Sequence, residues 1–176
     1  MIKLIRPLGL IMAVMCLSAF QPQPKSVLTT ETIKWYTFED AVKLSETKPK
    51  KIFIDVYTDW CGWCKRMDKD TFNDPIIAAY MNKHYYAVKL NAEQRDAINF
   101  NGKAFQYKNE YKANELALSL LQGKMSYPSG VFLDEKFGLL TVVQGYQDAN
   151  GFDPIIKYFA ENIYLNKTWE EYQRAR

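Results

Sequence analysis

The most constraining feature of the sequence is a cysteine pair, Cys61 and Cys64, that closely follows a short apolar run. Residues 51–57 read Lys-Ile-Phe-Ile-Asp-Val-Tyr, which predicts a buried strand, and Cys61 is expected to open a helix after it. The unpaired amides and the positive dipole end of that helix would point at the first sulfur. Cys61 would therefore ionise readily, and Cys64 could attack any mixed disulfide that Cys61 forms. The spacing predicts a two-electron redox switch.

The composition is typical of one globular domain. Of 176 residues, 48% are apolar and 15% aromatic, which suits a full hydrophobic core and argues against a disordered chain. The net charge of +3 falls by two without residues 1–20, which contain Lys3 and Arg6 and no acid. We therefore expect no nucleic-acid partner. We also expect no second domain, and a monomer.

The first 20 residues are typical of an export signal. A short basic region precedes an apolar run over 8–20, which is shorter than the ~20 residues that span a bilayer. We expect cleavage of this signal peptide, a flexible leader over 21–32, and export to the periplasm or another extracytoplasmic space. An uncleaved anchor and a lipoprotein attached through Cys16 are the alternatives. Met15 argues against the lipoprotein, because a small residue normally precedes the modified cysteine.

Cleavage would leave Cys61 and Cys64 as the only cysteines. Two cysteines in an oxidising compartment usually form a structural disulfide, but this pair closes too small a loop to constrain the unfolded chain much. A structural metal site needs about four ligands, and the sequence offers one histidine, His84, and no second cysteine pair. Redox chemistry is therefore the favoured interpretation, with no metal and no organic cofactor.

Strands and helices are expected to alternate along the chain, which implies parallel crossovers and a sheet covered on both faces. An Asn-Gly turn at 101–102 predicts a hairpin within the less regular segment 91–112, with an irregular loop as the alternative. Thr168 can begin a helical tail over 167–176, after a domain over 33–166. The predicted strands are 33–36, 51–57, 85–90, 131–133 and 139–144, and the predicted helices are 38–46, 61–71, 76–83, 114–122 and 155–165.

Three features in order make the chain resemble the thioredoxin superfamily over roughly residues 33–165: the segment 54–65 around the cysteines, Tyr127-Pro128 before a strand, and Gly145 after the last strand. The run Trp-Cys-Gly-Trp-Cys-Lys at 60–65 resembles exported thioredoxin-like proteins and the C-terminal domain of membrane disulfide reductases. The resemblance implies an α/β thioredoxin-like fold, with a central mixed β-sheet flanked by helices and a hairpin-like insertion at 91–112.

The resemblance also implies catalytic roles. Cys61 matches the solvent-accessible nucleophile, Cys64 the buried resolving thiol, and Pro128 the cis-proline that faces the disulfide. Asp55 matches a buried acid that takes the proton of Cys64, with a pKa raised by burial. A solvent-facing carboxylate at the end of the strand is the alternative for Asp55.

Substrate contacts are expected around the sulfurs, at Trp60, Gly62, Trp63, Tyr127 and Gly145. The three aromatic side chains would form a rim that grips unfolded or partly folded proteins, while the backbone of Tyr127 pairs with an extended substrate. Packing under the loop is the alternative for Trp60. Trp63 stands where thioredoxin has proline and some oxidising relatives have histidine. An indole cannot stabilise a thiolate as a cation does, which favours the reducing direction.

We therefore expect an exported thiol:disulfide oxidoreductase of the reductase or isomerase type, which reduces protein disulfides through the Cys61–Cys64 dithiol. Its partners would be protein thiols and disulfides, and a membrane electron donor would regenerate the dithiol. The alternative is a non-catalytic thioredoxin-fold binding or chaperone-like module whose cysteines rest as a disulfide.

Overall fold

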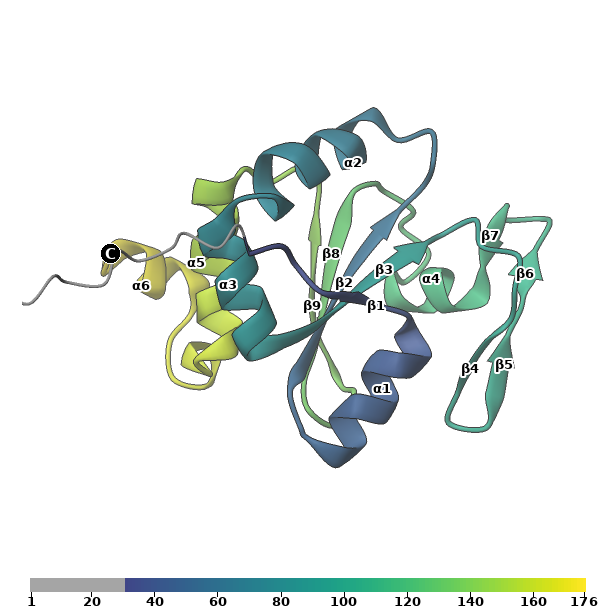
Figure 1. Cartoon of the computed structure of the whole chain (residues 1–176), viewed down its shortest axis with the longest axis horizontal. Coiled ribbons are helices and arrows are strands. Elements are labelled where there is room, and N and C mark those ends of the chain that lie inside the picture. The colour runs from purple at the N-terminus through teal and green to yellow at the C-terminus, as the bar shows by residue number, and fades with distance from the viewer. Residues whose placement is uncertain (1–30) are drawn as a thin grey trace, which may run out of the picture.

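The computed structural model describes residues 31–176 and has a mixed five-stranded sheet at its centre, in the order β1-β3-β2-β8-β9 (Figure 1). β1, β3 and β2 are parallel, and β8 runs antiparallel to both β2 and β9. The strands are β1 (Trp35–Tyr36), β2 (Lys51–Tyr57), β3 (Tyr85–Asn91), β8 (Ser129–Leu133) and β9 (Leu139–Gln144). The predicted thioredoxin-like fold is confirmed, while β1 is shorter than the expected strand 33–36.

Helices cover both faces of the sheet (Figure 1). α1 (Phe38–Thr47) and α4 (Glu115–Leu120) pack on one face, and α2 (Gly62–Met67), the π-helical turn η1 (Asp68–Phe72), α3 (Pro75–His84) and α5 (Ala149–Ala160) pack on the other. Alternation along β2 points Ile52 and Ile54 into the first layer and Phe53 into the second. Asp55, two residues after Phe53, therefore lies on the face covered by α2 and η1.

Side chains cap the starts of three helices, and the start at Thr168 is as the sequence predicts. The Thr37 hydroxyl accepts a hydrogen bond from the Asp40 amide at the start of α1. The Asp74 carboxylate caps α3, with proline in the first turn. Thr168 and Glu171 form a capping box at the start of the tail helix α6 (Trp169–Arg174).

The predicted boundaries of α5 are wrong at both ends. The helix begins at Ala149 because the Asp148 carboxylate accepts a hydrogen bond from the Gly151 amide at 2.7 Å. Pro154, directly before the predicted start at residue 155, lies inside the helix. The carbonyl that it leaves without a partner belongs to Asn150 in the exposed first turn, where water can replace the lost bond.

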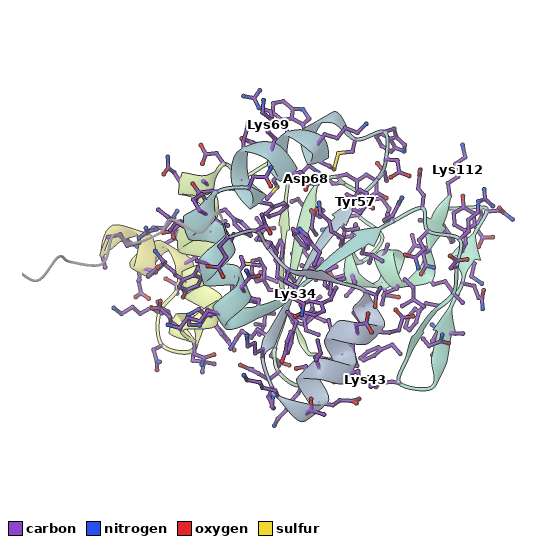
Figure 2. The ribbon with its side chains drawn as sticks, in the orientation of Figure 1. Lys34, Lys43, Tyr57, Asp68, Lys69 and Lys112 are labelled. Carbon is purple, nitrogen blue, oxygen red and sulfur yellow. A yellow bond between two sulfur atoms is a disulfide. The ribbon has the colours of Figure 1, made fainter. Side chains whose placement is uncertain are left out.

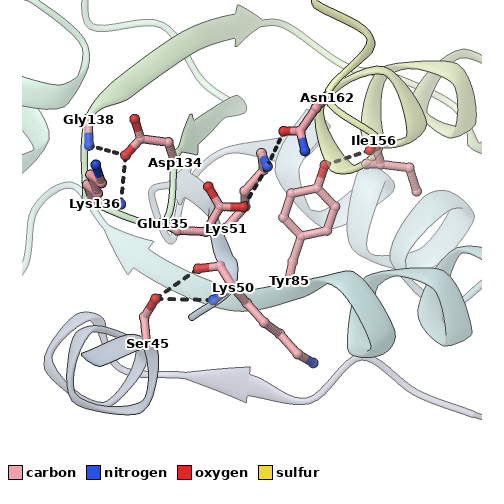
Figure 3. Close-up of polar contacts among 10 residues, drawn as sticks. All are labelled: Ser45, Lys50, Lys51, Tyr85, Asp134, Glu135, Lys136, Gly138, Ile156 and Asn162. Atoms are coloured by element: carbon pink, nitrogen blue, oxygen red, sulfur yellow. Dashed lines mark hydrogen bonds and ion pairs between the residues drawn. The ribbon is translucent and has the colours of Figure 1, made fainter. Parts of the chain in front are cut away.

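The C-terminal end of α5 is fixed by side chains from distant segments. Asn162 adopts a left-handed conformation, with φ 58°, and only a 3-10 turn (Ile163–Leu165) follows it. Its side-chain oxygen accepts a hydrogen bond at 2.7 Å from the ammonium of the buried Lys51, which also pairs with Glu135 at 2.7 Å (Figure 3). The Tyr85 hydroxyl donates to the Ile156 carbonyl at 2.6 Å in the same region (Figure 3).

The segment between β3 and α4 contains two small hairpins. The predicted Asn-Gly hairpin is confirmed as β4 (Ile98–Phe100) and β5 (Lys103–Phe105), with positive φ at both turn residues, 48° at Asn101 and 72° at Gly102. A second pair, β6 (Tyr107–Lys108) with β7 (Ala113–Asn114), follows. Phe100 packs edge-on against Phe38 at 5.3 Å between ring centroids, which fixes the insertion beside α1.

The predicted signal peptide, its alternatives and the leader up to residue 30 lie outside the described residues. Within residues 31–176, none of the helices has the length and apolar character needed to span a bilayer.

Candidate active site

Cys61 and Cys64 form a disulfide at the N-terminal end of α2, with an S–S distance of 2.10 Å and Cα atoms 5.3 Å apart. Cys61 is the N-cap residue of this helix, and its sulfur accepts a hydrogen bond from the Cys64 amide at 3.1 Å. The Cys61 amide in turn donates to the Thr58 carbonyl at 3.1 Å, which closes the loop from β2. The position at a helix N-terminus is the one that the sequence predicts, and it favours a negative charge on this sulfur.

Both cysteines are buried in the disulfide form. Cys61 is 5% exposed and Cys64 is 2% exposed. The expectation of an openly accessible Cys61 is therefore wrong for this state, because its sulfur turns inward to Cys64 and to the helix amide.

Asp55 lies on β2 beneath this helical layer and is 1% exposed, so the solvent-facing alternative is wrong. Its carboxylate accepts a hydrogen bond at 2.6 Å from the ammonium of Lys89 on β3, and that ammonium also pairs with Asp68 of η1. Burial raises the pKa of Asp55 to about 6, although Lys89 pulls it down. Figure 2 shows Asp68 on the helical layer beside Tyr57, where β2 ends. The sequence interpretation identified neither Lys89 nor Asp68.

Pro128 is buried in the segment that enters β8, and the Tyr127–Pro128 peptide bond is cis, as expected. The Pro128 carbonyl accepts a hydrogen bond from the Gly145 amide at 2.8 Å. Gly145 adopts a φ of 88°, in the left-handed region that favours glycine. β8 then pairs with β2, with Gly130 opposite Asp55, which brings the proline segment to the same end of the sheet as the disulfide.

One half of the aromatic rim is built on the loop before the disulfide. Trp60 is 66% exposed, so packing under the loop is excluded. Its ring meets Tyr127 edge-on with centroids 5.9 Å apart, and its indole N–H donates to Glu93 at 3.0 Å. Glu93 follows β3 and is a contact that the sequence interpretation missed.

The other half of the rim surrounds Trp63, which is 56% exposed. Its ring pairs with Tyr146 at 5.3 Å, and the Arg66 guanidinium lies 5.7 Å from the Trp63 ring and 5.9 Å from the Tyr146 ring. Arg66 also bonds Asp70 at 3.1 Å. At Gly62, between the cysteines, an added Cβ would meet no atom within 4 Å beyond the neighbouring residues. Tyr146 was not predicted, although it directly follows Gly145.

Residues 25–136 match the family model described as Thioredox_DsbH, a protein of unknown function (DUF255). The chain belongs to this Thioredox_DsbH family.

Solved structures similar to this Thioredox_DsbH chain show the same fold. A DsbH oxidoreductase superposes with a TM-score of 0.56 at 16% identity, over 80% of this chain and 91% of that one. A putative disulphide-isomerase from Bacteroides thetaiotaomicron superposes with a TM-score of 0.54 at 24% identity, over 78% of this chain and 98% of that one.

Curated relatives of the Thioredox_DsbH chain match shorter segments. The thiol:disulfide interchange protein DsbD of Citrobacter koseri is 50% identical over 34 residues, which cover 19% of this chain and 6% of that protein. An uncharacterized protein of Caenorhabditis elegans is 30% identical over 67 residues, which cover 38% of this chain and 9% of that protein. The chain thus spans less than a tenth of the length of these two relatives. The DsbD match agrees with the resemblance to membrane disulfide reductases.

Two further observations define what the site of this Thioredox_DsbH protein offers chemically. Between residues 31 and 176, no group of three or more His, Cys, Asp or Glu side chains is arranged to hold a metal ion. The candidate site combines a disulfide at a helix N-terminus with a buried carboxyl group in the layer beneath it. These groups are suited to the exchange of a dithiol for a disulfide.

Proposed function

We propose that the protein is an exported thiol:disulfide oxidoreductase that reduces disulfides in protein substrates. The observation that carries the proposal is the Cys61–Cys64 disulfide, placed at the start of α2 above the buried Asp55. A structural disulfide has no need of a buried proton acceptor or of exposed aromatic side chains around it. Both features are those expected of a site that exchanges thiols with a large partner.

In the proposed reaction, the Cys61 thiolate attacks one sulfur of a substrate disulfide and releases the other as a thiolate. The Cys64 thiol then gives its proton to the Asp55 carboxylate and attacks the Cys61 sulfur. The mixed disulfide breaks, the second substrate sulfur leaves, and the Cys61–Cys64 disulfide forms again. Two electrons pass from the protein dithiol to the substrate, which ends as two thiols. A pKa of about 6 leaves Asp55 mainly ionised at neutral pH and still basic enough to accept a proton.

The proposed partners are protein substrates and a membrane electron donor that supplies the next two electrons as a dithiol. The segment matched to a thiol:disulfide interchange protein supports a donor of this class. The basic and apolar residues at 1–20 support export to the periplasm or another extracytoplasmic space. The Cys61–Cys64 pair would be the whole redox centre, with no metal or organic cofactor, in a monomeric protein.

The basic test is the reduction of a model protein disulfide with dithiothreitol as the electron donor. We expect the purified protein to accelerate the reaction well above the rate with dithiothreitol alone. A rate no higher than that of dithiothreitol alone would contradict the proposal.

Replacing Cys64 by alanine is expected to trap substrates on Cys61, because the attacking thiol that resolves the mixed disulfide is gone. Non-reducing electrophoresis of the exported fraction should show covalent adducts that disappear on reduction. The control is the double variant in which Cys61 is also replaced by alanine. A non-catalytic binding module would give the same captured proteins with both variants, and none of them through a disulfide.

Replacing Trp63 by alanine is expected to raise the KM for an unfolded protein substrate about tenfold, which is the loss of about 1.4 kcal/mol of binding. The KM for a small aromatic-free disulfide should change little, since it cannot reach the rim. Tyr111→Ala is the matched control, because Tyr111 is a comparably exposed aromatic residue (62%) on the insertion. Equal effects of the two substitutions would rule out a specific substrate contact at Trp63.

A further inference from the structure

The ammonium of Lys89 lies between two carboxylates that differ greatly in exposure. It bonds Asp55 of β2 at 2.6 Å and Asp68 of η1 on its other side. The Asp55 side chain is 2% exposed, that of Lys89 is 22% exposed, and that of Asp68 is 45% exposed. The three groups thus form a continuous polar connection from beneath α2 to the solvent. With both acids ionised the cluster carries one excess negative charge, and with a proton on Asp55 it is neutral.

Aromatic rings hold the Lys89 ammonium in this position. Its Nζ atom lies 4.9 Å from the ring centroid of Trp35, 5.1 Å from that of Tyr57 and 5.2 Å from that of Phe72. These ring contacts favour the ammonium in this place, and because the Lys89 side chain is only 22% exposed, a carboxylate partner stabilises its charge throughout the reaction. Burial opposes the charge of Lys89, but the two carboxylates outweigh burial and raise its pKa above the ordinary value.

When Asp55 accepts a proton, Lys89 loses one of its two anionic partners. If Asp55 were the sole partner, protonation would leave a partly buried ammonium without a carboxylate, which is strongly unfavourable. Asp68 remains bonded to Lys89, so the ammonium keeps one carboxylate partner when Asp55 is protonated. We propose that Asp68 is a positioning residue that acts through Lys89 and allows Asp55 to take up the proton of Cys64. This inference rests on the proposed reductase function.

The other groups around Asp55 do not offer Lys89 a second anion. Tyr57 of the same strand presents its ring to the Lys89 ammonium at 5.1 Å, and α2 in the layer above contributes the cysteine pair, which is uncharged as a disulfide. On the neighbouring strand β8, the residue opposite Asp55 is Gly130. Asp70 lies on the same helical turn as Asp68, but its carboxylate bonds Arg66. Asp70 therefore provides a matched control for removing one negative charge from η1.

The experiment compares Asp68→Asn with Asp70→Asn in the otherwise complete protein. One measurement is the pH dependence of the resolution step, followed as release of substrate from a preformed mixed disulfide. The other is the direct titration of the Asp55 carboxyl group by carbon-13 NMR in the oxidised protein. We expect Asp68→Asn to move both profiles to lower pH by about one unit, because the like charge that opposes ionisation of Asp55 is removed. The resolution rate at pH 7 should fall about threefold with the weaker base.

Asp70→Asn should leave both profiles in place, and Asp68→Glu should restore the wild-type profile because it keeps the charge. Profiles unchanged by Asp68→Asn, or moved equally by Asp70→Asn, would overturn the inference. The NMR titration measures the effect of Asp68 on the pKa of Asp55 even if the protein catalyses no reduction. An inactive wild type with a shifted Asp55 titration would therefore contradict the proposed function alone, and an active wild type with an unshifted titration would contradict the role of Asp68 alone.

Discussion

Replacing Cys61 by serine is expected to abolish the reduction of protein disulfides, with a loss of at least about a thousandfold in the catalysed rate. The thiolate is the attacking group, and a serine hydroxyl at this position does not ionise at neutral pH. The helix amide that bonds the Cys61 sulfur would bond the hydroxyl equally well, so the fold does not depend on the sulfur itself. The measurement is reduction of a model protein disulfide with dithiothreitol, with the rate of dithiothreitol alone subtracted.

Cys64→Ser is the matched control for this experiment. Both variants lose the disulfide, so any loss of stability that comes from the missing crosslink is shared. Cys64→Ser keeps the attacking thiol, and dithiothreitol in the assay can resolve its mixed disulfide in place of Cys64. A partial rate is therefore expected from Cys64→Ser and none from Cys61→Ser. Equal residual rates would show that the two sulfurs do not have the distinct roles proposed for them.

The part of the site that could be predicted is the part that is local in the sequence. Cys61, Cys64 and the preceding loop lie within one strand–loop–helix unit, so their geometry follows from the pattern of residues 51–64. Lys89 is different, because it is an ordinary lysine within a predicted strand. Only the parallel register of β2 and β3, which places Lys89 beside Asp55, brings the two charges together. That register cannot be predicted from the spacing of the residues or from the composition.

The contact of Glu93 with Trp60 was missed, although the position of Glu93 in the sequence could have predicted it. It lies just after the end of β3, and β2 ends just before Trp60. Because the carboxyl ends of parallel strands meet at one edge of a sheet, polar residues after two such strands are expected near each other.

The start of α5 was predicted at the wrong residue for another reason. Asp148 and the Asp153-Pro154 pair are both good start signals, and the choice between them depends on the burial of Phe152 in the core.

Replacing Asp55 by asparagine is expected to make the oxidised protein more stable at pH 7, by at most about 3 kcal/mol of unfolding free energy. Burial raises the pKa of Asp55 from 3.8 to about 6. Between these values the folded protein keeps a proton that the unfolded chain releases, so stability falls as the pH rises through this window. Above about pH 6 the full cost of the buried carboxylate is present. Asparagine has a similar shape and carries no charge, and Lys89 keeps Asp68 as its partner.

The pH dependence separates this explanation from a general gain in packing. The stabilisation by Asp55→Asn should be largest at pH 7 and should vanish near pH 4, where Asp55 is protonated in the folded protein. Urea unfolding of the oxidised protein at both pH values measures it, with the exposed Asp70→Asn as the control. The same variant should reduce protein disulfides more slowly at pH 7, because Cys64 has lost its proton acceptor. A gain of equal size at both pH values, or a variant as fast as the wild type, would contradict the role proposed for Asp55. The buried carboxylate thus lowers stability at the pH where the proposed reaction needs it.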